Sequence, residues 1–204
     1  TGLWPRPTDP GVAFGPRPRL HPPSPGLFWR PDKGTDMLGF ITVNDMAGAA
    51  NRLLADTATR LQAQGWRLAG AVQDNLDRGP DRDCDMDLRI LGDDGPAIRI
   101  SQSLGIHATA CRLDTGALAL AVGRAEAVLA RGADLVIVNK FGKQECYGRG
   151  FRDFIAEALA QGIPVLLSVP PEQLADFREF AGDLAEPVAR EAVLDWCHAQ
   201  RMAA

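Results

Sequence analysis

The chain has 204 residues, of which 46% are hydrophobic and 24% are charged. This composition is that of a globular domain and excludes a wholly disordered chain, a collagen-like fibre and a disulfide-dense miniprotein. The net charge is −4 and the sequence pI is about 5.4, which argues against nucleic acid as a partner. No apolar run approaches the roughly 18 residues of a membrane span, so no membrane partner is expected. The four cysteines show no CxxC pair and no zinc spacing, which favours a reducing cytoplasm.

Proline divides the chain, because nine of its 15 prolines precede Met37. Proline fixes φ and lacks an N–H donor, so this stretch can form neither a helix nor a central strand. We therefore predict a disordered, proline-rich extension over 1–36 and a single domain over 37–204. The extension is interpreted either as a flexible arm that lies on the domain through its aromatics, or as sequence upstream of a natural start at Met37. A proline-rich ligand for a protein partner is a third interpretation.

After Met37 the hydrophobic pattern alternates between strands and helices. Strands are predicted at 38–43, 66–72, 134–138 and 163–169, and helices at 46–64, 115–131, 151–160, from 171 and at 188–200. Alternating polar and apolar residues at 84–89, a turn at 92–95 and a strand at 97–101 predict a β-hairpin. Strands separated by helices predict a mostly parallel sheet covered on both faces. The expected fold class is α/β, with three layers and an inserted β-hairpin.

Polar residues follow several of the predicted parallel strands. Asn44 and Asp45 follow the first strand, Gln73 follows the second, and Asn139 and Lys140 follow the strand at 134–138. Ligands of open α/β sheets bind outside the carboxyl ends of the strands. These five residues are therefore candidate ligand-binding residues.

Positive charge gathers after the strand at 134–138 in an otherwise acidic domain. Residues 37–204 carry 17 basic and 23 acidic side chains, a net charge of −6. Lys140 is followed by Lys143, and Arg112 lies in another predicted turn. This set predicts a site for a small anion, phosphate or another oxyanion. The alternative is that Lys140 pairs with an acidic residue and only fixes the loop, the candidates being Asp45, Asp74 and Glu145.

Other reactive side chains give weaker signals. The aspartates at 81, 83, 85 and 87 lack the glycine and glutamate of a calcium loop, so we expect a solvated row partnered by Arg82 and Arg89, and no metal site. Cys84 and Cys111 are expected to be buried apolar residues, with a shared redox or metal role as the alternative. His107 is expected to be a loop residue rather than a base. The sequence leaves the cofactor unknown.

Segments of this chain resemble two related families. One is a bacterial family known only as a domain of unknown function, some members of which occur beside molybdate-transport genes; the other is the THEP-type nucleoside-triphosphatases. The resemblance covers about 37–170 and rests on Gln73, Cys84-Asp-Met-Asp-Leu88, Ile100-Ser-Gln-Ser-Leu-Gly105, Cys111-Arg-Leu-Asp114 and Asp134-Leu-Val-Ile-Val-Asn-Lys-Phe-Gly-Lys-Gln-Glu145.

This resemblance implies a P-loop-NTPase-like fold. Gly142 and Glu145 match the D-E-x-G-x-x-E pattern of the THEP-type enzymes, whereas Asn139 and Lys140 replace its acidic pair. The segment after the first strand lacks the lysine and Ser/Thr of a P-loop. The parts that normally bind Mg²⁺ and the γ-phosphate are therefore missing.

Three functional hypotheses follow. The first is a degenerate P-loop-like protein that binds a nucleotide or oxyanion without ordinary hydrolysis, with a link to molybdenum metabolism. The second is a divergent nucleoside-triphosphatase in which Glu145 positions water. The third is a protein-interaction scaffold that uses the extension and the hairpin. Whether the chain is an enzyme is left open by its sequence.

Overall fold

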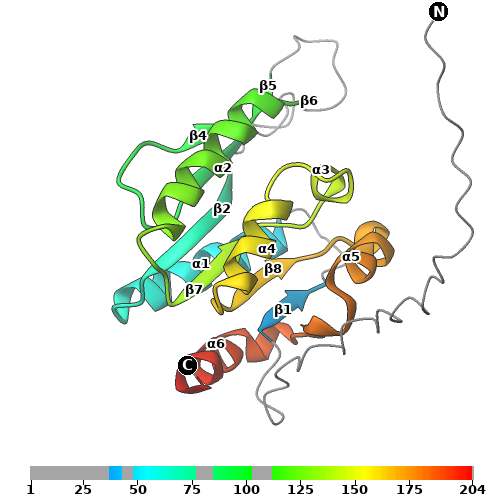
Figure 1. The fold of residues 1–204 in the computed structure, drawn as a ribbon. Helices are drawn as coiled ribbons and strands as arrows, with labels where there is room; N and C mark the ends of the chain where they lie inside the picture. The colour runs from blue at the N-terminus through cyan, green and yellow to red at the C-terminus, as the bar shows by residue number, and fades with distance from the viewer. Residues whose placement is uncertain (1–36, 43–47, 77–84, 103–111, 204) are drawn as a thin grey trace, which may run out of the picture. The chain divides into compact units, whose positions relative to one another are not determined.

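The computed structural model describes residues 37–42, 48–76, 85–102 and 112–203. A seven-stranded sheet with the order β4-β3-β2-β7-β8-β1-β9 forms the centre of this domain (Figure 1). Its strands are β1 (Leu38–Ile41), β2 (Leu68–Leu76), β3 (Asp85–Ile90), β4 (Ile98–Arg99), β7 (Leu135–Val138), β8 (Val165–Ser168) and β9 (Ala185–Pro187). A separate pair joins β5 (Ser101–Gln102) to β6 (Arg112–Leu113).

The strands from β2 to β9 in the sheet order are parallel, and the hairpin strands are antiparallel. β1 pairs in parallel with β8 on one side and β9 on the other, and β7 pairs in parallel with β2 and β8. β3 runs antiparallel to β2 and β4. The mostly parallel sheet with an inserted hairpin is therefore confirmed.

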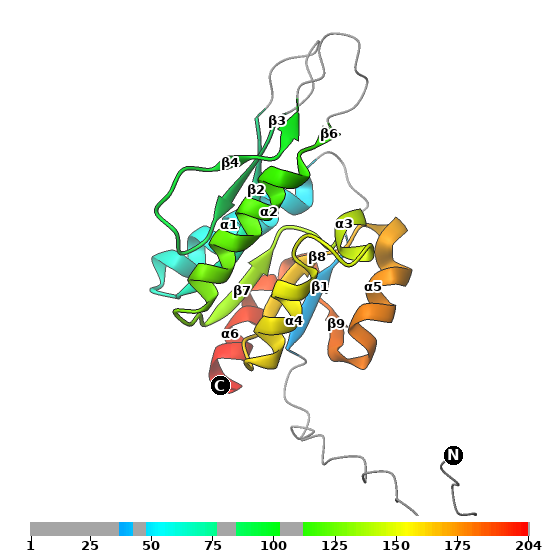
Figure 2. The same cartoon turned by 45° about the horizontal axis from the view of Figure 1, so that its top comes forward.

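Helices cover both faces of the sheet, as Figures 1 and 2 show. α1 (Ala49–Ala63) and α6 (Val193–Ala203) pack on one face, and α2 (Thr115–Leu129), α4 (Arg152–Ala160) and α5 (Leu174–Ala181) pack on the other. The strands β1, β7 and β8 are buried on both faces, which explains the unbroken apolar runs of β7 and β8. The predicted three-layer architecture is confirmed.

Short elements differ from the sequence-based expectation. The predicted strand at 97–101 is divided between β4 and β5, which belong to different sheets. β9, β6 and the single helical turn α3 (Lys143–Cys146) were not predicted. Three 3₁₀ turns complete the domain: η1 (Pro171–Gln173), η2 (Gly182–Leu184) and η3 (Arg190–Ala192). Among the described helices, none combines the length and apolarity that crossing a bilayer requires. The predicted extension, residues 1–36, lies outside the described residues and stays a prediction.

Candidate functional site

A cavity of about 360 Å³ lies at the carboxyl ends of β2 and β7. The loop after β7 forms one wall, through Lys140, Lys143 and Glu145, and the hairpin strand β3 contributes Met86 and Leu88. This is the edge of a parallel sheet where ligands of α/β proteins bind. Of the predicted site residues, the structure brings five together here: Gln73, Asn139, Lys140, Lys143 and Glu145.

A cluster of carboxamide side chains joins β2 and β7 at the cavity. The Asn139 Oδ1 atom accepts a hydrogen bond from the backbone N–H of Gln73 at 3.2 Å. The Asn139 Nδ2 group donates to Gln73 Oε1 at 3.3 Å and to Asn51 Oδ1, from α1, at 3.1 Å. Asn139 and Gln73 are both buried, so these bonds satisfy polar atoms that would otherwise be costly to bury. The cluster is neutral and fixes the ends of two neighbouring strands.

The end of β8 is joined to the same point. The Ser168 hydroxyl donates to the backbone carbonyl of Asn139, and the backbone N–H of Phe141 donates to the carbonyl of Ser168 at 2.8 Å. The chain leaving β7 therefore begins its loop from a fixed backbone position.

Glu145 organises that loop from within. Its carboxylate is buried and accepts two backbone hydrogen bonds of 2.9 Å, from the N–H of Gly142 and from the N–H of Phe151. Burial raises the pKa of Glu145 above its ordinary value, although both hydrogen bonds and the charge of Lys140 act in the opposite direction. Gly150 has a φ of +59°, and a Cβ there would lie 2.1 Å from Glu145 Oε1, so glycine is required beside the carboxylate. These contacts make Glu145 a positioning residue of the loop, and its predicted role in water activation stays a prediction.

The two lysines of the loop lie at the rim of the cavity and are exposed. Among the described residues, neither forms an ion pair with a carboxylate. Asp74, one of the partners considered for Lys140, lies 3.8 Å from Arg89 instead, and Glu145 is engaged by backbone N–H groups. Within the part of the chain that the structure describes, the loop-fixing role falls to Glu145 rather than to Lys140.

Arg152 belongs to the loop scaffold rather than to the cavity. Its guanidinium donates to the backbone carbonyl of Glu145 at 3.1 Å and lies 4.5 Å from the centroid of the Phe180 ring. Arg152 therefore joins the loop to α5.

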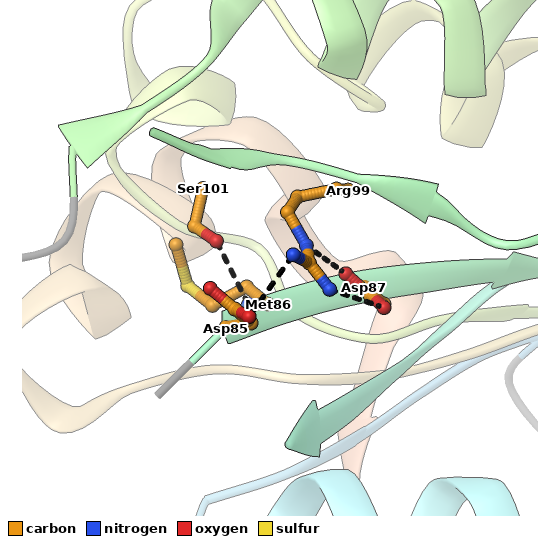
Figure 3. Close-up of polar contacts among 5 residues, drawn as sticks. All are labelled: Asp85, Met86, Asp87, Arg99 and Ser101. Carbon is orange, nitrogen blue, oxygen red and sulfur yellow. Dashed lines mark hydrogen bonds and ion pairs between the residues drawn. The ribbon is translucent and has the colours of Figure 1, made fainter. Parts of the chain in front are cut away.

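The hairpin corrects the expected pairing of the aspartate row. Asp85 and Asp87 both pair with Arg99 of β4, at 3.0 and 2.9 Å (Figure 3), whereas Arg89 pairs with Asp74. The reason is register: Asp87 lies directly opposite Arg99 in the β3–β4 pairing. The other predicted partner, Arg82, lies outside the described residues. No cluster of three or more potential metal ligands occurs among the described residues.

Several predicted residues fall outside what the structure describes. Asn44 and Asp45, and also Cys84, His107 and Cys111, lie in segments that are not described. Arg112 is placed in β6, but its side chain is outside the description.

Sequence reasoning also missed residues of this site. Asn51 lies in the first turns of α1. The sequence predicted this helix but did not indicate that Asn51 contacts Asn139. Leu113 lines the cavity from β6, a strand without a clear sequence pattern, and Gln173 lines it from the start of the helical region predicted from 171. Met86 and Leu88 were predicted as the apolar side of a strand, but nothing in the sequence indicated that this side borders a cavity.

The sheet order and the helix layers define an α/β protein with a P-loop-NTPase-like fold. Among solved structures the chain is similar to THEP1 from the hyperthermophile Aquifex aeolicus, with a TM-score of 0.53 and 15% sequence identity. The match covers 78% of this chain and 94% of that one. At this identity the likeness establishes the fold alone, and it confirms the fold that the resemblance implied.

The chain belongs to the family described as "Protein of unknown function (DUF2478)", whose model matches residues 40–196. A curated relative is the "Molybdenum import ATP-binding protein ModC 2" of Bradyrhizobium diazoefficiens, which is 38% identical over 147 residues. That match covers 71% of this chain but only 16% of the relative. The family resemblance seen in the sequence is thereby confirmed.

Proposed function

We propose that this protein binds a nucleotide or a small oxyanion in the cavity after β7, without ordinary nucleoside-triphosphate hydrolysis. The observation that carries the proposal is the pair of lysines at the cavity rim. The whole chain has three lysines, Lys33, Lys140 and Lys143, and two of them border this cavity. In a domain with a net charge of −6, such a concentration favours an anionic ligand.

The donor set around Asn139 supports binding without metal-dependent hydrolysis. The acidic pair of the THEP-type pattern is replaced by Asn139 and Lys140, and the Asn139 amide is used by Gln73 and Asn51. Mg²⁺ prefers carboxylate oxygens, and an ammonium at this position disfavours a cation. The described residues therefore do not fit a magnesium site, and in this proposal Lys140 supplies positive charge toward the ligand.

The relative named as a molybdenum import ATP-binding protein supports a link to molybdenum. Because this chain spans 16% of that protein, the link is part of the proposal, and molybdate is one oxyanion to be tested. A cytoplasmic setting is also proposed, consistent with the free thiols of Cys146 and Cys197.

Lysine labelling tests the proposal with an internal control. We would acetylate the amines of the full chain with a water-soluble ester, with and without ATP, ADP, phosphate, molybdate or tungstate, and quantify each lysine by peptide mass spectrometry. A bound anion is expected to slow acetylation of Lys140 and Lys143, several-fold, and to leave Lys33 unchanged. Equal rates at all three lysines for every ligand would contradict the proposal.

Calorimetric titration of variants gives an independent readout. Lys140→Ala and Lys143→Ala are each expected to weaken the anion that protects the lysines by about tenfold, the effect of losing a charge-assisted contact. Lys33→Ala changes the net charge equally and is the matched control. If Lys33→Ala weakened binding to the same extent, the effect would be general electrostatics and the site would be wrong.

A divergent nucleoside-triphosphatase is the second candidate, favoured by the buried Glu145 with its raised pKa. Phosphate release from ATP or GTP that disappears in Glu145→Gln would support it.

The scaffold hypothesis, with a protein partner, is tested by pull-down with the full chain and with residues 37–204.

A further inference from the structure

The described lining of the cavity is divided into a polar half and an apolar half. Lys140, Lys143 and the carboxamides lie on the side of the β7 loop. The opposite side consists of Met86, Leu88, Ile100, Leu113 and Leu118, which come from the hairpin, β6 and α2. Because these apolar side chains line the cavity together with the lysines, the cavity offers an apolar surface as well as positive charge.

A bare oxyanion would use only half of this cavity. Its volume of about 360 Å³ lies in the range of roughly 300–1,000 Å³ that is typical of sites for organic ligands. An inorganic ion in contact with the apolar side chains would lose hydration without compensating hydrogen bonds. The lining instead matches a molecule with an apolar body and a charged end.

The apolar half is fixed in place before any ligand arrives. Arg99 pairs with both Asp85 and Asp87, and the Ser101 hydroxyl accepts a 3.0 Å hydrogen bond from the backbone N–H of Met86 (Figure 3). Residues alternate between the two faces of a strand, so contacts at 85 and 87 set the orientation of Met86 and Leu88 toward the cavity. A wall that is already ordered loses little entropy on binding.

We propose that the ligand is an organic anion that carries a flat ring, as a nucleotide or another phosphorylated heterocycle does. The ring lies against Met86, Leu88 and Leu113, and the anionic group lies at Lys140 and Lys143. This inference rests on the proposed function, because it assigns the chemical class of the ligand at the same lysines. The proposed function includes both nucleotides and inorganic oxyanions. This inference favours the nucleotide-like class over molybdate or phosphate.

The test compares anions with and without a ring on the full chain. Inorganic phosphate, molybdate, ribose 5-phosphate, AMP, GMP and UMP would be titrated by calorimetry. At least one mononucleotide is expected to bind ten times or more tighter than ribose 5-phosphate, since an apolar ring leaves water. If no mononucleotide exceeds ribose 5-phosphate while ribose 5-phosphate or phosphate still binds through Lys140 and Lys143, the inference is overturned and the proposed function stands. If no anion binds, both are overturned.

Two cavity-filling variants locate the ring. Leu113→Trp and Met86→Phe enlarge half-buried side chains at the cavity and are expected to reduce the advantage of the mononucleotide over ribose 5-phosphate to less than twofold. Leu120→Trp, at an exposed position of α2, is the matched control and should keep the full advantage. Thermal unfolding verifies that each variant is folded. A mononucleotide advantage that survives both filling variants would overturn the placement.

Discussion

The two faces of the sheet differ in how completely they are packed. On the α1/α6 face, a Cβ at Gly39 of β1 would lie 2.7 Å from the Trp196 ring, so the helix and the strand are in the closest contact that a glycine permits. On the α2/α4/α5 face, the helices leave the carboxyl ends of β2 and β7 open, and the cavity forms there. The close packing between α6 and β1 on the α1/α6 face lies away from the cavity, so this packing should be open to change without a change in ligand binding.

The largest expected effect comes from the closed face. Trp196 is 8% exposed, and its indole N–H donates to Glu186 of β9. Trp196→Ala should lower the free energy of unfolding by about 3–5 kcal/mol, because it leaves a cavity between α6 and the sheet. Denaturant titration measures the loss. Anion binding, measured where the variant is folded, should be unchanged, and weakened binding would show that the faces are coupled.

Gly39 tests the same contact from the opposite side. Gly39→Ala should lower the free energy of unfolding by about 1–3 kcal/mol, because the added methyl group overlaps the Trp196 ring. In a Trp196→Leu background the same substitution should have a smaller effect, since a flexible side chain can move away. A double-mutant cycle measures the difference. An equal loss in both backgrounds would assign the penalty to something other than the ring.

On the open face, Glu145→Gln should lower the free energy of unfolding by roughly 1–3 kcal/mol. The amide retains one acceptor but directs an N–H₂ group at a backbone N–H, either of Gly142 or of Phe151, which leaves a buried donor unsatisfied. Because the loop carries Lys140 and Lys143, anion binding should weaken as well. Stability loss with full binding would mean that the loop keeps its shape without this carboxylate.

The loss should also depend on pH, because burial raises the pKa of Glu145 in the folded protein. The folded protein then holds this proton more tightly than the unfolded chain does. The contribution of Glu145 to stability is therefore full below its unfolded pKa and falls as pH rises through the raised folded pKa. The difference between the wild type and Glu145→Gln should accordingly be larger at pH 4 than at pH 8, which unfolding titrations at both pH values check.

The smallest stability effect is expected for Arg99→Gln, which removes the ion pairs with Asp85 and Asp87. The Arg99 side chain is 42% exposed, whereas the two carboxylates are 17% exposed. Pairs that are open to solvent on one side contribute little to folding, so the unfolding midpoint should hardly move. Mononucleotide affinity should nevertheless fall, because the apolar wall loses its orientation. Arg67→Gln, which removes an exposed pair with Asp134 at the other end of the sheet, is the matched control and should leave affinity unchanged.

The main elements of this fold were predictable because their signals are local. β7 is an unbroken run, Leu-Val-Ile-Val, bounded by polar residues, and α1 and α2 show helical spacing of apolar residues. β9 was missed because its three residues, Ala-Glu-Pro, have no strand pattern. It is a strand only because β1 offers a free edge for pairing, which is a tertiary cause.

The location of the site was predictable, but the contacts that its residues make were not. The rule for parallel sheets led to Gln73, Asn139 and Lys140. The sequence could not show that the carboxylate of Glu145 accepts backbone hydrogen bonds, because that depends on how the loop turns back from Phe151. Nor could it show that Arg99 would pair with Asp85 and Asp87, since the strand register decides that contact.

The position of β1 has a consequence for how the domain assembles. β1, at 38–41, lies between β8, at 165–168, and β9, at 185–187, so its partners follow more than 120 residues later in synthesis. Pairing strands that are so far apart in the sequence closes a long loop, which costs conformational entropy. Domains dominated by such contacts fold slowly. During synthesis, the apolar residues of β1 therefore stay unpaired until nearly the whole domain has left the ribosome, which leaves them accessible to chaperones.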